Sequence, residues 1–291
     1  MTTTAVKGGR ATLRAVLVLL LLVVAAIAVR DRLPDLGETV VVLGEVDGWW
    51  ATAAVIAALA SQLAFAEQQR QLLAGAGVAV PVKRVLAMTL GRSAMSMTLP
   101  AGSAVSAAFA YRVYRHHGAA TSVAVRVTAV SGVLSLAGLG LLYLAGWLLS
   151  TPAAWSWAAL GAATLGLLAI LFWDKSVMAR HAIGRAEGRA LAAAVINWAL
   201  DMFCLVAAAA ACGVTLGWWQ LALVYLAVQV VRQIPLTPGG LGLIEASMLT
   251  GLVTAGMPES TAAAVVLLYR LVSFWMILPL GLTGWMATRR T

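Results

Sequence analysis

Long uncharged apolar stretches alternate along the chain with short polar segments that are mostly basic. A helix needs about 20 apolar residues to cross the hydrocarbon core of a bilayer. The 47 uncharged residues from 127 to 173 therefore have room for two crossings. The pattern predicts an all-α, polytopic helical membrane protein with about seven spans. Its apolar runs cover residues 15–29, 48–66, 127–173, 191–211, 218–231 and 261–287.

Two further segments are apolar but interrupted by proline and glycine. In the first, Pro100 is followed by Gly102, and in the second, Pro238 is followed by Gly239 and Gly240. Each Pro has another glycine eighteen positions later, and each is preceded by an arginine, Arg92 or Arg232. Paired broken segments of this kind are typical of transporters, because a break frees backbone groups that a ligand can use. We favour broken, re-entrant helices over a pair of ordinary kinked helices.

The domain organisation follows from these segments. Residues 1–291 form a single integral membrane domain, with pseudo-repeat halves at about 13–150 and 190–288 and a linking span at 153–173. If both broken segments are re-entrant, we expect the halves to run parallel and the C-terminus to lie outside. A true crossing at the second break would instead place it inside.

The distribution of charge indicates orientation. Lys7, Arg10 and Arg14 precede the first apolar run, whereas the segment after it, residues 30–47, holds two arginines against five acids. Because positive residues remain on the cytoplasmic side, the N-terminus is predicted to be cytoplasmic. A cleaved signal peptide ending near Ala28 is the alternative for this first run.

Composition supports the same class of protein. Hydrophobic residues make up 62% of the chain and charged residues only 11%, which excludes an ordinary soluble domain. The formal net charge is +9, but the basic residues lie mainly beside apolar runs, where they suit anionic lipid rather than nucleic acid. We therefore expect a multi-pass protein of the plasma (inner) membrane whose partners are anionic membrane lipids. The oligomeric state stays open.

No pattern in the sequence predicts catalysis. The histidines, His116, His117 and His181, lie in basic loops without a Cys or carboxylate at ligand spacing, so neither a metal site nor a cofactor is expected. A membrane-embedded enzyme would need a nucleophile with a base, or clustered acids for a metal. We find neither, and the prediction is that the protein is not an enzyme.

Ionisable residues inside apolar runs are the candidate functional residues, since a charge costs about 2.5–3.5 kcal/mol at the centre of a membrane helix. Arg92, Arg232 and Arg270 are candidates for holding a lipid phosphate. Glu245 is expected at the start of a half-helix and paired with Arg270, and Asp201 is a possible partner of Arg232. Arg112 and Arg115 are expected to reach the cytoplasmic surface. The turn itself is predicted at Gly239, Gly240 and Gly242, with Pro238 ending the preceding helix.

The stretch "PLTPGGLGLIEASMLTGLVTAGM", followed by "AAAVVLLYRLVSFW", resembles the lysylphosphatidylglycerol synthase transmembrane family, also called the flippase-like domain family. The family's Pro-Gly-Gly-x-Gly-x-x-Glu run matches from Pro238 to Glu245, and its Tyr-Arg pair matches Tyr269 and Arg270. The upstream "MTLPAGSAVSAAFAYRVYR" resembles the family's other motif, around Pro100 and Gly102. It departs from that motif at Ser96, where Asn is expected, and at Ser103, where an acid is usual.

The resemblance covers the membrane half of such synthases alone, without their soluble domain. It implies a lipid flippase or transporter-like protein that handles an anionic phospholipid or a polyprenyl-linked lipid. The alternative is a non-transporting membrane partner or scaffold for a cytoplasmic lipid-modifying enzyme.

Overall fold

The computed structural model describes residues 36–99, 101–149, 184–232 and 237–289, and this part of the chain is helical without strands. Four helical segments within it are long and apolar enough to cross a membrane. They are α3 (Gly48–Gly75), α6 (Thr121–Leu149), α9 (Arg185–Ala211) and a composite helix made of α12 (Glu259–Arg270), the π-helical turn η3 (Leu271–Trp275) and α13 (Ile277–Arg289). A short helix, α2 (Leu36–Gly44), precedes α3.

The count of about seven spans is not reproduced within the described residues. The expected spans at 15–29 and 153–173 lie outside them. The expected span at 218–231 is helix α10 (Trp218–Arg232), which has only 15 residues. A helix rises 1.5 Å per residue, so α10 reaches about 22 Å and falls short of the bilayer core.

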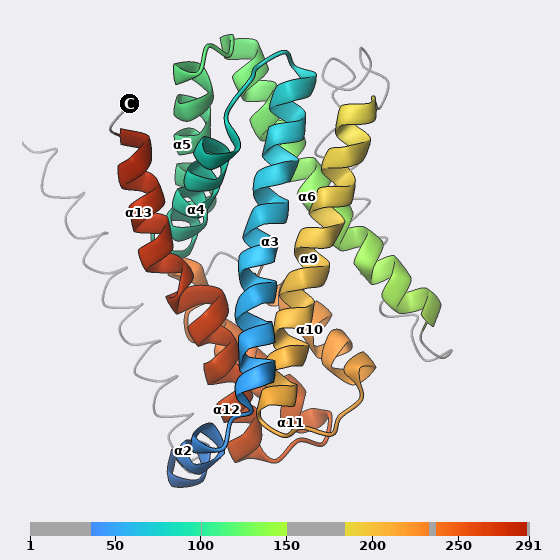
Figure 1. Cartoon of the computed structure of the whole chain (residues 1–291). Coiled ribbons are helices and arrows are strands. Elements are labelled where there is room, and N and C mark those ends of the chain that lie inside the picture. Colours follow the sequence, from blue (N-terminus) through green and yellow to red (C-terminus); the bar gives the residue numbers. More distant parts are fainter. Residues whose placement is uncertain (1–35, 100, 150–183, 233–236, 290–291) are drawn as a thin grey trace, which may run out of the picture.

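Helices α3 and α9 pack along their whole length in opposite directions (Figure 1). At one end, the N–H of Asp47 donates to the carbonyl of Ala211 at 2.9 Å. At the other end, Gly75 approaches Ala186 so closely that a Cβ on Gly75 would lie 2.6 Å from the Ala186 methyl. Small residues allow such close helix packing in a membrane, where packing rather than hydrophobicity holds helices together.

Each of these two helices is followed by a helical hairpin. Helix α4 (Val82–Thr98) turns back into α5 (Gly102–His116), and α10 turns through the 3₁₀ turn η2 (Pro238–Gly240) into α11 (Leu243–Thr254). The arms of the first hairpin are joined by Arg92 Nε, which donates to Ser106 Oγ at 3.3 Å. In the second, Gly251 lies against the side chain of Val224. Both broken segments are therefore hairpins.

The second arm of each hairpin ends in the same way. Gly118 and Gly256 both have positive φ, at 84° and 101°. The residue after each glycine donates its N–H to a carbonyl five positions back, in Tyr114 and Leu252 respectively. This is the hydrogen-bond pattern of a glycine-terminated helix, and it explains why each proline is followed by a glycine at the same interval.

The two halves run antiparallel, so the expectation of parallel halves is wrong. Figure 1 shows the α4–α5 hairpin at one end of the bundle and α10 and α11 at the other. The end of α13 returns to the first of these ends, where Arg84 Nη1 donates to the carbonyl of Ala287 at 2.8 Å. The C-terminal helix thus ends beside the start of α4, which carries Lys83 and Arg84. The sequence interpretation failed because it counted α10 as a full span rather than as one arm of a hairpin.

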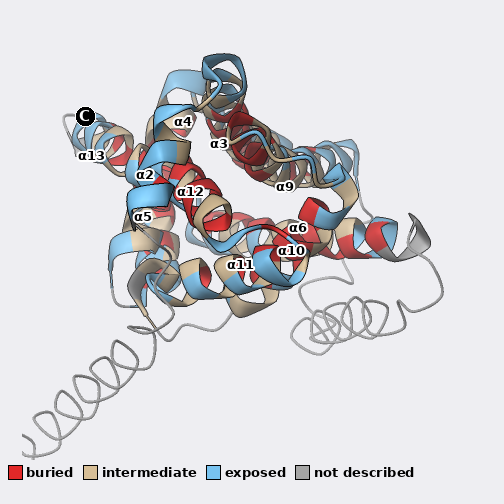
Figure 2. Cartoon of the chain, turned by 90° about the horizontal axis from the view of Figure 1, so that it is seen from below, coloured by how far each residue is buried: buried red, intermediate tan, exposed pale blue. Residues whose placement is uncertain are grey.

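Buried residues line α3, α9, α10 and α12 (Figure 2). The outward faces carry large apolar side chains, such as Leu267, Leu271 and Trp275, each more than half exposed. Their spacing of four residues places them on one stripe of the helix. Such a stripe is unfavourable in water but is the natural surface of a helix that faces lipid.

Candidate functional site

The turn of the second hairpin is built from glycine. Gly239, Gly240 and Gly242 have φ of 62°, 68° and 81°, as expected from the sequence. Pro238 begins the turn η2, and α10 is described as far as Arg232. Residues 233–236, where the preceding helix would end, lie outside the described residues.

Glu245 joins this turn to the last long helix. One carboxylate oxygen, Oε2, accepts a hydrogen bond from the N–H of Gly242 at 2.7 Å. The other, Oε1, lies 2.6 Å from Nε of Arg270. Because Glu245 occupies the first turn of α11, its negative charge also meets the positive end of the helix dipole. The Glu245–Arg270 pair expected from the sequence is therefore present.

Arg270 is buried, with 6% of its surface exposed. Its Cζ lies 4.3 Å from the centre of the Phe274 ring, a cation–π distance. The short Nε contact with Glu245 is an ion pair without hydrogen-bond alignment, and Nη2 has no hydrogen-bond partner in the described part of the chain. Buried donors are rarely left without an acceptor, so this guanidinium has capacity for a further ligand.

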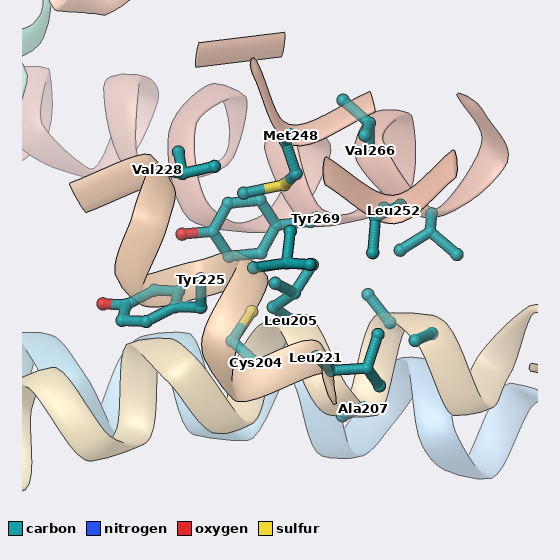
Figure 3. Packing of buried hydrophobic residues seen from close by; sticks show 14 of the residues in the cluster. Cys204, Leu205, Ala207, Leu221, Tyr225, Val228, Met248, Leu252, Val266 and Tyr269 are labelled. Atoms are coloured by element: carbon teal, nitrogen blue, oxygen red, sulfur yellow. The ribbon is translucent and has the colours of Figure 1, made fainter. Parts of the chain in front are cut away.

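Asp201 on α9 contacts a second group of polar side chains. The hydroxyl of Tyr225 donates to its Oδ2 at 2.8 Å, and the hydroxyl of Tyr269 donates to its Oδ1 at 3.2 Å. Nη1 of Arg232 lies 3.4 Å from Oδ2. Figure 3 shows the two tyrosine rings packed in the apolar core with their hydroxyls directed to the same side. Helix α12 thus presents neighbouring residues to both acids: Tyr269 to Asp201 and Arg270 to Glu245.

Tyr225 was not singled out from the sequence, although Asp201 offered a signal. A carboxylate inside an apolar run needs donors, and tyrosine supplies a hydroxyl on an otherwise apolar ring. The two acids also determine the net charge of this group of residues. Arg232 pairs with Asp201 and Arg270 pairs with Glu245, so the formal charges of these four residues sum to zero.

Arg92 lies in the other hairpin and has different surroundings. It is 8% exposed, and its Nη1 donates to Oε1 of Gln69 at 2.8 Å. The same oxygen accepts from the Tyr114 hydroxyl at 2.5 Å, and the Phe65 ring centre lies 5.3 Å from Arg92 Cζ. No carboxylate in the described residues forms an ion pair with it. Among the described residues, Arg92 is therefore a buried cation whose partners are all neutral.

The remaining expected residues belong to the first break. Pro100 lies outside the described residues. At Gly102, a Cβ would lie 2.3 Å from the carbonyl oxygen of Ser96, so this position requires glycine because of close backbone approach. Ala101, rather than a glycine, has the positive φ of this turn, at 53°. Among the residues that the structure describes, no group of three or more His, Cys, Asp or Glu side chains is placed to hold a metal ion.

Comparisons with known sequences identify the family of the chain. Residues 12–281 match the family model described as the lysylphosphatidylglycerol synthase TM region. Two proteins of Methanothermobacter thermautotrophicus, each described as a UPF0104 membrane protein, are 33% and 30% identical to the chain over 87 residues. These matches cover 30% of this chain and 26% of each relative, so the matched part spans about a quarter of the relatives' length. The family match covers nearly the whole sequence, and the chain belongs to the lysylphosphatidylglycerol synthase transmembrane-region family.

Proposed function

We propose that this protein is a flippase-like lipid transporter that handles an anionic phospholipid or a polyprenyl-linked lipid. The observation that supports the proposal is the meeting of the tips of two helical hairpins that lie toward opposite ends of the bundle. Inverted repeats with broken helices near the bilayer midplane are the architecture in which many transporters bind their cargo.

The buried arginines support an anionic head group as cargo. Arg92 has no carboxylate partner among the described residues, and Nη2 of Arg270 has no hydrogen-bond partner there. A guanidinium can hold a phosphate through two parallel hydrogen bonds. Arg232, at 35% side-chain exposure, is the most open of the three and is the candidate for first contact.

Transport also requires that the site open. Arg92 and Arg270 are both nearly closed to solvent in this conformation. A lipid head group can reach them only if the hairpins separate from α3 or from the composite helix. Under this proposal, the conformation described here is the closed state of the transport cycle.

Reconstitution tests this function directly. We would place the protein in vesicles that contain fluorescent phosphatidylglycerol and follow the dye that becomes reducible from outside. The proposal predicts faster exchange between leaflets than in empty vesicles, and a loss of that exchange in Arg92→Gln and Arg270→Gln. Arg70→Gln, which removes an exposed arginine paired with Glu67, is the matched control and is expected to behave as the wild type.

Two outcomes would count against transport. Exchange no faster than in empty vesicles would favour the non-transporting partner or scaffold. Equal exchange in the wild type and in both arginine variants would show that these residues do not handle the lipid. Folding of each variant is checked by its melting temperature in detergent.

A further inference from the structure

A second basic site lies apart from the two hairpin tips, at the end of the bundle where α13 finishes. It is a pocket between the start of α4, the end of α5 and the last turns of α13, with about 750 Å³ of empty space that opens to the surroundings. Its basic lining consists of Arg84, Arg112, His116 and His117. None of the described residues that line it is acidic.

Arg112 is one of the two arginines that line this pocket. Its side chain is exposed, and it has neither an ion pair nor a hydrogen bond within the described part of the chain. Arg84, by contrast, donates to the carbonyl of Ala287 and so fixes α13 against α4. The pocket therefore has one wall held in place by Arg84 and one arginine whose donors remain available.

The rest of the lining is apolar and aromatic, with Phe109 on α5 and Trp285 on α13. Tryptophan rings prefer the level of the lipid head groups, where one side is apolar and the other is wet. A basic patch above an apolar wall is the arrangement that accepts a phosphate together with the start of an acyl chain. A free inorganic phosphate would use only the basic half.

The structure assigns to this pocket a binding site for the phosphate of an anionic membrane lipid, held by Arg112, with the acyl chains lying against Phe109 and Trp285. This site is separate from the proposed transport site, since it shares no residue with the groups around Arg92, Asp201 and Glu245. The histidines, His116 and His117, add donors at its rim.

A matched pair of variants tests the assignment. Arg112 lines the pocket, whereas Arg115 lies one turn further along α5, is also exposed, donates to the carbonyl of Ala119 at 2.7 Å, and is not part of the lining. Arg112→Gln and Arg115→Gln remove the same charge from the same helix. Native mass spectrometry of the purified full chain, titrated with phosphatidylglycerol, would measure the affinity for each.

We expect Arg112→Gln to weaken phosphatidylglycerol binding about fivefold, the effect of roughly one basic residue near a membrane surface. Arg115→Gln should change it less than twofold, and phosphatidylcholine should bind weakly to all forms. The fivefold loss should persist in an Arg270→Gln background, which separates this site from the proposed transport site.

Three results would overturn the assignment. Equal losses in the two variants would indicate general surface attraction. Equal affinity for phosphatidylcholine would show that the phosphatidylglycerol charge is not recognised. Full displacement of the lipid by millimolar inorganic phosphate would assign the pocket to a free anion instead.

Discussion

Gly239 packs against the carbonyl oxygen of Met97, and this contact joins the tips of the two hairpins. A Cβ built on Gly239 would lie 2.2 Å from that oxygen and 2.8 Å from the Phe274 ring. The glycine also has a φ of 62°. Any side chain at this position would therefore push apart two segments that come from opposite ends of the bundle.

Gly239→Ala is predicted to destabilise the protein strongly. A left-handed backbone costs an L-residue about 1–2 kcal/mol, and forcing a methyl group against a backbone carbonyl adds about 1–3 kcal/mol. Thermal melts in detergent would measure the effect. Gly213→Ala is the control, because Gly213 has a φ of 70° but nothing within 4 Å of its Cβ position. Equal losses of stability would mean that the hairpin tips do not touch.

Glu245 and Arg270 are predicted to be energetically coupled. Removal of one partner from a buried ion pair typically costs about 3–5 kcal/mol, because the other charge remains uncompensated. Glu245→Ala and Arg270→Ala should each destabilise, and the double variant should cost less than their sum. A double-mutant cycle of melting free energies measures the coupling.

The pair Glu67–Arg70 provides the comparison for that cycle. Its atoms are also 2.6 Å apart, but its side chains are 40% and 37% exposed. Exposed pairs contribute about 0.2–1 kcal/mol, so its coupling should be clearly smaller. Strict additivity at Glu245 and Arg270 would instead mean that their short contact contributes nothing to stability.

The second break could be predicted from the sequence because its residues have strong local backbone preferences. Glycines at 239, 240 and 242 mark positive φ, and Glu245 lies at the start of the next helix, where a carboxylate is favourable. The partner of Glu245 was also predictable, since few cations occur in the following apolar run. Apart from the Glu245–Arg270 pair, these features depend on residues that lie close together in the chain.

The contacts between distant helices could not be predicted from the sequence in the same way. Gln69 and Tyr114 surround Arg92 from two different helices, and no local pattern relates them. The antiparallel halves were missed because α10 was taken for a span, although its 15 residues and the prolines after it indicated a shorter element. The π-helical turn Leu271–Trp275 has no proline or glycine to mark it.

The hydrogen bond from Tyr225 to Asp201 is predicted to contribute more to stability than the hydrogen bond from Tyr269. The Tyr225 hydroxyl is 2.8 Å from the carboxylate and the Tyr269 hydroxyl is 3.2 Å away. A hydrogen bond to a charged group contributes about 1.5–3 kcal/mol, so Tyr225→Phe should lower stability by roughly that amount and Tyr269→Phe by less. Tyr143→Phe, which removes a 2.6 Å bond to the neutral carbonyl of Leu226, is the control for an uncharged acceptor. A larger loss for Tyr143→Phe would contradict a charged Asp201.

The antiparallel halves also predict which ends of the helices share a side of the membrane. Helix α13 ends beside the start of α4, and the α3–α4 connection is followed by Lys83 and Arg84, which mark it as cytoplasmic. Single cysteines at Ala79 and Ala287 should therefore both be shielded from a membrane-impermeant thiol reagent on intact cells. A cysteine at Thr215, in the connection between α9 and α10, should react. The variants are made in a background that lacks Cys204 and Cys212, so that only the introduced thiol is labelled. Reaction of the cysteine at 287 but not of the one at 79 would mean that α13 ends on the opposite side from the basic loop, and the hairpins would then not enter from opposite ends.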